Sequence, residues 1–288
     1  MRVLVAGAGG MVGRAVTDYC RAQGDEVLAC EHATLDLTDA AGVMRVVRAG
    51  RPAAVINCAA WTDVDSCEAE AERAQAVNAH GPENLATASR DVGAVLVTIS
   101  TDYVFDGGRD GFYSQRDDPD PMSVYGRAKL DGERRAQFAS ARTIVVRTGF
   151  IFGPGGRNFL STVVARVNRG ERVNAIRDAW GTPTYSRHLA ARLRALAVLD
   201  LPGVYHVVNE GDGVSYEEFA RAVARTLGRD ESSIEGVPAD SLKRPAPRPR
   251  NARLKCLISP ALGLPALPDW QAALADFVRL EACSHSAE

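Results

Sequence analysis

The chain has 288 residues, of which 46% are hydrophobic and 24% are charged, and its 34 basic and 36 acidic residues give a formal net charge of −2. This composition is typical of a globular chain with a sizeable core and excludes a disulfide-stapled miniprotein. The near-neutral charge gives no overall attraction to nucleic acid or to an anionic membrane, so any anion site must be local.

Residues 1–150 alternate short aliphatic runs with longer helical patterns, which is the rhythm of βαβ units. Strands are predicted at Val3–Ala6, Glu26–Cys30, Ala53–Asn57, Ala94–Ser100 and Thr143–Arg147. Helices are predicted at Met11–Gln23, Asp39–Ala49, Pro82–Asp91 and Ser123–Phe138. Several of these strands are almost wholly apolar, which suits a parallel sheet covered on both faces. The pattern predicts an α/β, Rossmann-type, doubly wound domain.

After residue 150 the rhythm loosens into loops rich in glycine and proline. Helices are predicted at Asn158–Asn168, Arg187–Leu199, Tyr216–Leu227 and Trp270–Leu280. The third of these begins with a capping box, Ser215 followed by Glu218. No low-complexity linker separates the two parts. We expect residues 151–288 to form mainly a smaller substrate-binding lobe, with some segments returning to the first domain and a cleft between the two.

Glycines at positions 7, 10 and 13 directly follow the first strand and open the first helix. Glycine allows a tight turn and a close approach to a pyrophosphate, and the helix N-terminus adds unpaired N–H donors. A plain turn is the alternative, but the order of strand, loop and helix favours dinucleotide binding. The expected contacts are Gly7, Gly9, Gly10, Met11, Val12 and Gly13.

Glu31 ends the second strand, about 20 residues after the glycine loop, where a carboxylate accepts hydrogen bonds from the adenosine ribose. A carboxylate there repels a 2′-phosphate, so the sequence favours NADH over NADPH. The adjacent His32 would soften that repulsion.

Tyr125 and Lys129 stand four residues apart and therefore lie on one face of the predicted helix. A nearby ammonium lowers the pKa of a tyrosine and prepares it to protonate a carbonyl during hydride transfer. A surface tyrosine beside a salt-bridging lysine is the alternative. Thr101 follows the fourth strand, at the sheet edge where ligands bind, and can donate a hydrogen bond to the same carbonyl.

At these residues the chain resembles the extended short-chain dehydrogenase/reductase superfamily, and within it the dTDP-4-dehydrorhamnose reductase family. Apart from the glycine loop and the Tyr125/Lys129 pair, the matching segments are Asn57–Asp65, Val77–Asn78, Ser100–Gly107, Val146–Thr148, Asp178–Thr184 and Arg248–Leu254. The resemblance implies reduction by NAD(P)H of the 4-keto group of a nucleotide-activated 6-deoxyhexose, dTDP-4-dehydrorhamnose to dTDP-rhamnose.

The resemblance also implies roles for individual residues. Thr101, Tyr125 and Lys129 are expected to be catalytic. The cofactor groove is expected to include Asp36, Leu37, Ala59, Ala60, Thr62, Asn78, Tyr125 and Lys129. The substrate is expected to contact Thr101, Asp102, Tyr103, Val104, Phe150, Asn158, Thr182, Arg248, Arg250 and Arg253.

Related 4,6-dehydratases resemble this layout but carry an Asp-Glu pair after the threonine, where this chain has Asp102-Tyr103. The missing second carboxylate favours simple carbonyl reduction over elimination of water. A nucleotide-sugar epimerase remains an alternative. So does a non-catalytic NAD(P)-binding protein that resembles the regulatory subunit of methionine adenosyltransferase, although the intact triad favours an enzyme.

Two departures from the family fall on the sugar side. Phe150 stands where many members have tryptophan, so an indole N–H donor is lost, and Ala252 stands where a serine is usual.

The segment from Lys243 to Lys255 has six basic residues and no acidic one. Guanidinium groups suit a diphosphate, so one or two of its arginines are expected to meet the substrate. A solvated loop is the alternative.

The remaining expectations concern partners and location. We expect a nucleotide-sugar substrate, no nucleic acid and no membrane, because no apolar run approaches the roughly 18 residues of a spanning helix. The sequence leaves a homodimer open. No metal site is predicted, since no histidine stands at metal-ligand spacing and the six cysteines form no Cys-x-x-Cys pair. The apolar N-terminus has no convincing cleavage site, so we expect a cytoplasmic protein.

Overall fold

The computed structural model describes residues 1–285, with side chains described through residue 280. At its centre is a six-stranded sheet in the order β10-β5-β4-β3-β1-β2, in which every neighbouring pair is parallel. The strands are β1 (Arg2–Ala6), β2 (Glu26–Cys30), β3 (Ala54–Asn57), β4 (Val95–Thr101), β5 (Thr143–Thr148) and β10 (Gly203–His206). The predicted doubly wound α/β architecture is confirmed. The sixth strand, β10, was not predicted, because four residues after Pro202 carry little periodicity.

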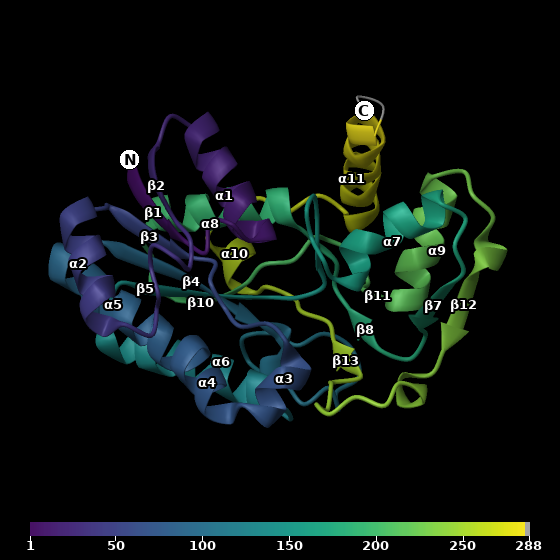
Figure 1. Ribbon diagram of the computed structural model, residues 1–288, viewed down its shortest axis with the longest axis horizontal. Helices are drawn as coiled ribbons and strands as arrows, with labels where there is room; N and C mark the ends of the chain where they lie inside the picture. The colour runs from purple at the N-terminus through teal and green to yellow at the C-terminus, as the bar shows by residue number, and fades with distance from the viewer. Residues whose placement is uncertain (286–288) are drawn as a thin grey trace.

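Helices cover both faces of the sheet (Figure 1). One face carries α1 (Met11–Ala22) and α8 (Ser186–Leu199), and the other carries α2 (Ala40–Gly50), α5 (Gly81–Val92) and α6 (Val124–Ala139). Alternate strand residues point to opposite faces: Val3 and Val5 pack toward α1 and α8, whereas Leu4 and Ala6 pack toward α2 and α5. Burial on both faces explains why several of the strands are almost wholly apolar.

The connection from β3 to α5 is helical, which the sequence did not reveal. It consists of α3 (Val64–Ala69), α4 (Ala71–Gln75) and the π-helical turn η1 (Ala76–His80). All three pack against α6. None of the helices within residues 1–285 is both long and apolar enough to cross a membrane.

Most of the remaining elements build a smaller lobe beside the C-terminal edge of the sheet (Figure 1). Its helices are α7 (Phe159–Asn168), α9 (Tyr216–Thr226) and α11 (Trp270–His285). The short helix α10 (Ile258–Ala261) lies instead against the central sheet, where Ile258 packs on the core beneath α1 and α8. The strands of the lobe are β6 (Ile151–Phe152), β7 (Val173–Ile176), β8 (Trp180–Gly181), β9 (Thr184–Tyr185), β11 (Val214–Ser215), β12 (Ile234–Val237) and β13 (Asn251–Ala252). They pair as β11-β8-β13, β12-β7 and β6-β9.

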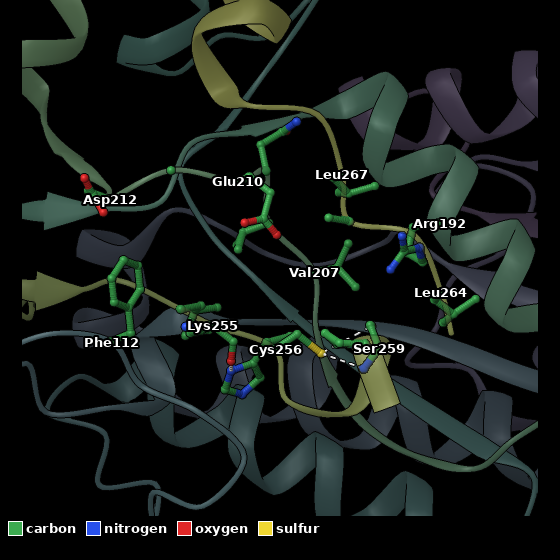
Figure 2. Close-up of a pocket in the computed structure, with 17 residues that line it drawn as sticks. Phe112, Arg192, Val207, Glu210, Asp212, Lys255, Cys256, Ser259, Leu264 and Leu267 are labelled. Carbon is green, nitrogen blue, oxygen red and sulfur yellow. Dashed lines mark hydrogen bonds between the residues drawn. The ribbon is translucent and has the colours of Figure 1, made fainter. Parts of the chain in front are cut away.

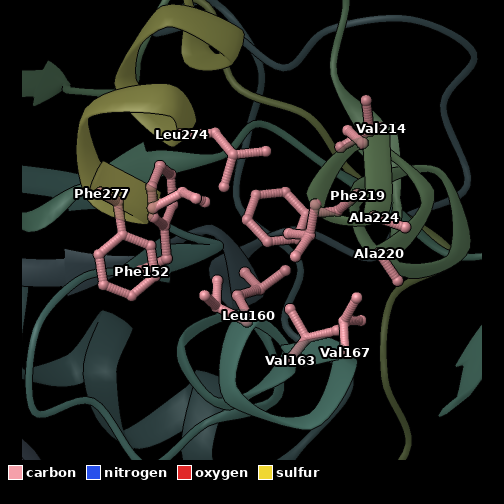
Figure 3. Packing of buried hydrophobic residues seen from close by; sticks show 14 of the residues in the cluster. Phe152, Leu160, Val163, Val167, Val214, Phe219, Ala220, Ala224, Leu274 and Phe277 are labelled. Atoms are coloured by element: carbon pink, nitrogen blue, oxygen red, sulfur yellow. The ribbon is translucent and has the colours of Figure 1, made fainter. Parts of the chain in front are cut away.

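The lobe has its own hydrophobic core, formed between α7, α9 and α11 (Figure 3). Phe152, Phe219 and Phe277 meet there with ring centroids 5.3 to 5.7 Å apart, and Leu160 and Trp270 pack around them. Burial of several aromatic rings gives this small lobe a stable core of its own.

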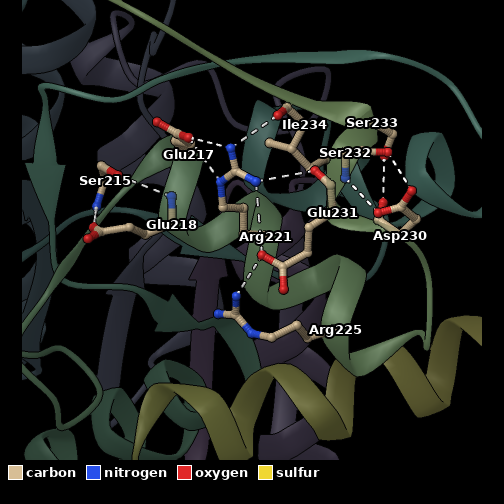
Figure 4. A network of polar contacts seen from close by, with 10 residues as sticks. All are labelled: Ser215, Glu217, Glu218, Arg221, Arg225, Asp230, Glu231, Ser232, Ser233 and Ile234. Carbon is tan, nitrogen blue, oxygen red and sulfur yellow. Dashed lines mark hydrogen bonds and ion pairs between the residues drawn. The ribbon is translucent and has the colours of Figure 1, made fainter.

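The start of α9 is fixed by polar contacts (Figure 4). The predicted capping box is confirmed: the Ser215 hydroxyl accepts from the Glu218 N–H at 3.1 Å, and the Glu218 carboxylate accepts from the Ser215 N–H at 2.7 Å. One turn on, Arg221 donates to Glu217 at 2.7 Å and to the Ile234 carbonyl at 3.3 Å, which joins α9 to β12. These contacts fix the position of Tyr216, the first residue of the helix.

Candidate active site

The glycine loop between β1 and α1 requires glycine for steric reasons. Gly7 has a φ of +74°, and a Cβ there would lie 2.7 Å from the backbone nitrogen of Ala59. A Cβ on Gly13 would overlap the carbonyl oxygen of Gly7. The loop therefore keeps the first turn of α1 against the end of β1, with the helix N-terminus open to an anion.

A cavity of about 460 Å³ adjoins this loop, and it is formed at the ends of β1, β2 and β3. It brings together eight of the predicted cofactor residues: Gly7, Gly9, Gly10, Glu31, Asp36, Leu37, Ala59 and Ala60. The Glu31 carboxylate lies close to the loop, 3.1 Å from where a Cβ on Gly9 would be. A pyrophosphate at the loop and a ribose at Glu31 fit this arrangement.

Other predicted cofactor residues do not line this cavity, namely Met11, Val12, Gly13, Thr62, Asn78, Tyr125 and Lys129. Asn78 shapes the wall instead, because its amide exchanges two 2.9 Å hydrogen bonds with the backbone of Trp61. Sequence reasoning missed Arg73, which lines the cavity with its guanidinium 4.4 Å from the centre of the Trp61 ring. A single arginine in an unpredicted helix gave no signal.

The three predicted catalytic residues meet where β4 ends and α6 begins. Ser123 caps α6 by accepting a 3.1 Å hydrogen bond from Gly126, so Tyr125 lies in its first turn and Lys129 one turn later. Both side chains are buried. The Tyr125 hydroxyl is hydrogen-bonded to the Thr101 side chain, and the Lys129 ammonium donates to the Ile99 carbonyl at 2.7 Å.

The electrostatics of this group differ from the expectation that Lys129 lowers the pKa of Tyr125. Burial raises the pKa of Tyr125 well above its usual value, and the hydrogen bond to Thr101 only partly opposes this rise. Burial also lowers the pKa of Lys129 to about 8, partly offset by Glu133. Loss of solvation is thus the largest cause of both shifts. Tyr125 is protonated at neutral pH, as a proton donor must be.

Two adjoining cavities, of about 440 and 320 Å³, lie on the lobe side of Tyr125. Both are lined by Tyr103, Phe150, Ile176, Tyr216, Leu242, Arg244 and Arg248. The Tyr103 ring meets the Tyr125 ring edge to face, with centroids 6.0 Å apart. Both cavities therefore adjoin Tyr125 through the Tyr103 ring, although Tyr125 itself lines neither of them.

Asp102 is the most unusual group in this wall. It is 3% exposed and accepts a 3.0 Å hydrogen bond from the Thr101 hydroxyl on Oδ1, while Oδ2 has no partner among the described residues. Burial raises the pKa of Asp102 to about 7. Oδ2 is buried against Gly149, and a buried carboxyl oxygen without a partner among the described residues marks Asp102 as a candidate functional group.

Phe150 has strained backbone geometry, with a φ of +46°. Its ring fills the space where a Cβ of Gly181 would be, and Asp102 fills the corresponding space at Gly149. The centroids of the Phe150 and Tyr216 rings lie 4.5 Å apart. Sequence reasoning missed Tyr216, whose hydroxyl is hydrogen-bonded to that of Tyr103. The only available signal was its place directly after the capping Ser215.

Two arginines of the basic segment form ion pairs that the sequence did not predict. Arg248 lines both lobe-side cavities and forms a bidentate pair with Asp65, at 2.8 and 2.9 Å. Its guanidinium holds the pKa of Asp65 below the usual value. Arg250 lies at the rim of the smaller cavity and pairs with Asp178 and Asp240. Asp65 and Asp178 are far away in sequence, and Asp240 lies just before the segment, which is why the segment looked uncompensated.

Four predicted substrate residues do not line these cavities. Thr101 lies behind the cavity wall, where its hydroxyl donates to Asp102. Val104 is fully buried in a cluster with Phe105 and Leu130, and Thr182 is bonded to the backbone of Leu254. Arg253 turns away to Asn251, 2.9 Å from its Oδ1.

Asn158 does line the larger cavity, and it also caps α7. Within the described residues, no three His, Cys, Asp or Glu side chains are arranged to hold a metal ion. Cys283 lies outside the side chains that the structure describes.

The chain is similar to known proteins in both sequence and fold. The family described as the RmlD substrate binding domain matches residues 1–283. A Streptomyces griseus protein named dTDP-4-dehydrorhamnose reductase is 40% identical over 281 residues, which cover 96% of this chain and 92% of that protein.

Two solved structures of proteins with the same name agree closely with this fold. The one from Clostridium acetobutylicum has a TM-score of 0.92 and 31% identity, and covers 98% of this chain and 100% of its own. The one from Bacillus anthracis, in complex with NADP, has a TM-score of 0.91 and 32% identity, and the match covers 96% of this chain and 98% of that one.

Proposed function

The chain belongs to the dTDP-4-dehydrorhamnose reductase family, and we propose that it uses a nicotinamide dinucleotide to reduce dTDP-4-dehydrorhamnose to dTDP-rhamnose. One observation carries the proposal. Protonated Tyr125, bonded to Thr101, adjoins the lobe-side cavity through Tyr103, at the edge of the sheet that also carries the glycine loop.

Bound NAD(P)H supplies the hydride that reaches the carbonyl carbon of the sugar. As negative charge develops on the carbonyl oxygen, Tyr125 donates its proton to that oxygen. The Thr101 hydroxyl orients Tyr125 through their hydrogen bond. Lys129 places a cation on the same helix face, and that charge favours the tyrosinate that remains after proton transfer.

The lobe-side cavities provide for the rest of the substrate. Asp102 and Tyr103 face the sugar next to the reacting carbonyl, with Phe150 and Tyr216 as apolar walls. Arg244 and Arg248 receive the diphosphate, and Asp65 keeps the Arg248 guanidinium in position. In this proposal residues 1–150 bind the cofactor, together with α8 and β10, and most of residues 151–288 bind the substrate.

The cofactor preference follows from Glu31. Its carboxylate lies against the glycine loop, where it accepts from ribose hydroxyls and repels a 2′-phosphate. Arg73 and His32 line the same cavity and reduce that repulsion. The proposal is therefore an enzyme that prefers NADH and also accepts NADPH.

The test is to incubate the purified protein with dTDP-4-dehydrorhamnose and NADH or NADPH, and to follow loss of nicotinamide absorbance and formation of dTDP-rhamnose. Equal amounts of cofactor oxidised and sugar reduced are expected. A GDP-linked 4-keto sugar is the control for the nucleotide. An inverted sugar without net cofactor oxidation would identify an epimerase, and cofactor binding without any turnover would identify a binding protein.

A further inference from the structure

A cavity of about 470 Å³ lies apart from the proposed active site (Figure 2). Among the described residues, none that lines it also lines the three cavities discussed above. Its walls come from α8, from the chain after β10, and from the segments on either side of α10. Val207, Leu264 and Leu267 supply an apolar lining.

Arg192 is the unusual side chain in this cavity. It is 7% exposed, and among the side chains that the structure describes no carboxylate lies within ion-pair distance of its guanidinium. The guanidinium donates a hydrogen bond to the carbonyl oxygen of Pro265. The other described arginine with such low exposure is Arg147, which forms a 2.7 Å ion pair with Glu133.

A buried guanidinium without an anion is costly, because the lost hydration is not replaced. In agreement with this, burial lowers the pKa of Arg192. Figure 2 shows Arg192 among Val207, Leu264 and Leu267, on the side of the cavity that also holds Cys256. The Arg192 side of the cavity therefore combines a cation with an apolar surface.

The other charged groups of the lining are Lys255, Glu210 and Asp212, and all three are exposed. A dianion such as phosphate would meet one buried cation, Arg192, and at the rim one lysine against two carboxylates. A single negative charge matches Arg192 better.

We propose that this cavity is a binding site for a small organic monoanion, a carboxylate with an apolar body, whose carboxylate pairs with the guanidinium of Arg192. The planar fork of an arginine matches a carboxylate with two parallel hydrogen bonds. The apolar body of the ligand lies against Val207, Leu264 and Leu267.

The probe is benzoate, titrated into the full-length wild-type protein by calorimetry, with benzamide as the neutral control of the same shape and inorganic phosphate as the dianion. Saturable binding of benzoate, with benzamide at least about 10-fold weaker, is expected for a charged hydrogen-bonded pair. The position of the site is tested by alkylation of Cys256, located by mass spectrometry. Its thiol is in the same lining, and bound benzoate should slow its alkylation.

Arg192→Met should weaken benzoate binding by about 10-fold or more. It should also leave the midpoint of thermal unfolding unchanged or higher, since it removes an uncompensated buried charge. Arg187→Met, on the exposed face of the same helix, is the matched control and should bind as wild type does.

Equal affinity for benzoate and benzamide, or protection of Cys256 by phosphate alone, would overturn the proposal. Unchanged benzoate binding in the Arg192 variant would do the same. If the methionine variant does not fold, benzoate binding is measured in Arg192→Lys, which keeps the charge and loses the planar fork. The comparison of benzoate with benzamide in the wild type also tests the proposal.

Discussion

The cofactor side and the sugar side of Tyr125 are built in different ways. On the cofactor side the close contacts involve backbone atoms: Gly7 meets the nitrogen of Ala59, and Gly13 meets the carbonyl of Gly7. On the sugar side they involve side chains, such as the ring of Phe150 at Gly181. Backbone contacts fix a geometry that any member of the fold can share. Side-chain contacts can be exchanged one by one, so this is where substrate choice can change.

The sugar side also contains two energetically unfavourable features. They are a carboxyl group with an unpartnered oxygen, Asp102, and a strained residue, Phe150. Both features are costly for the folded chain and are typical of sites shaped by function. Tyr125 stands at the boundary, so its replacement tests whether the two sides can be separated.

Tyr125→Phe should lower turnover by about 10²-fold or more, because it removes the proton donor. Its affinity for NADH should stay at the wild-type value, since Tyr125 does not line the cavity at the glycine loop. Steady-state kinetics and a fluorescence titration with NADH measure the two effects. Tyr19→Phe, on α1, is the control and should keep normal turnover. A parallel loss of NADH binding would show that the two sides are not independent.

Asp102→Asn should stabilise the protein at alkaline pH. The folded pKa of Asp102, about 7, lies above the ordinary aspartate value of 3.8, so folding favours the protonated form. That contribution is complete below about pH 4 and is lost as the pH rises toward and past 7.

The wild type should therefore be about 1–3 kcal/mol less stable than the asparagine variant near pH 8, and the gap should narrow near pH 5. Urea unfolding at the two pH values measures the free energy of unfolding. The exposed Asp212→Asn should show no such dependence on pH. If the difference in free energy of unfolding between the wild type and the Asp102 variant were the same at both pH values, the pKa of Asp102 would not be raised in the folded protein.

This contrast also explains how much could be predicted from the sequence. The glycine loop, Tyr125 and Lys129 follow from local patterns, because strand, turn and helix succeed one another within a few residues. The ion pair of Arg248 with Asp65 joins residues far apart in the chain, and the position of Tyr216 depends on α9. No spacing in the sequence carries that information. The strand β10 was missed for a similar reason, since only its pairing with β5 makes it a strand.

Arg248→Ala should raise KM for the nucleotide sugar about 10-fold with a smaller change in kcat, because a diphosphate remote from the carbonyl is held alike in ground and transition states. Arg244→Ala should act in the same direction. Arg250→Ala is the matched control: Arg250 is more exposed and is held at the rim by two carboxylates, so its effect should be smaller. Equal, wild-type KM values for all three variants would mean that the diphosphate binds elsewhere.

The smallest expected effect tests the cofactor side. Glu31→Ala should reduce the preference for NADH over NADPH by a few-fold, about 1 kcal/mol, because one partly screened charge near the 2′-phosphate is removed. Glu31→Arg should go further and favour NADPH. The ratio of kcat/KM for the two cofactors measures the preference, and KM for the nucleotide sugar should not change in either variant.

Arg73→Ala is the complementary variant, since it removes the cation that lines the same cavity and should increase the preference for NADH. A wild-type enzyme that already prefers NADPH would contradict the role given to Glu31. It would indicate that Arg73 and His32, which share this cavity, dominate the electrostatics there.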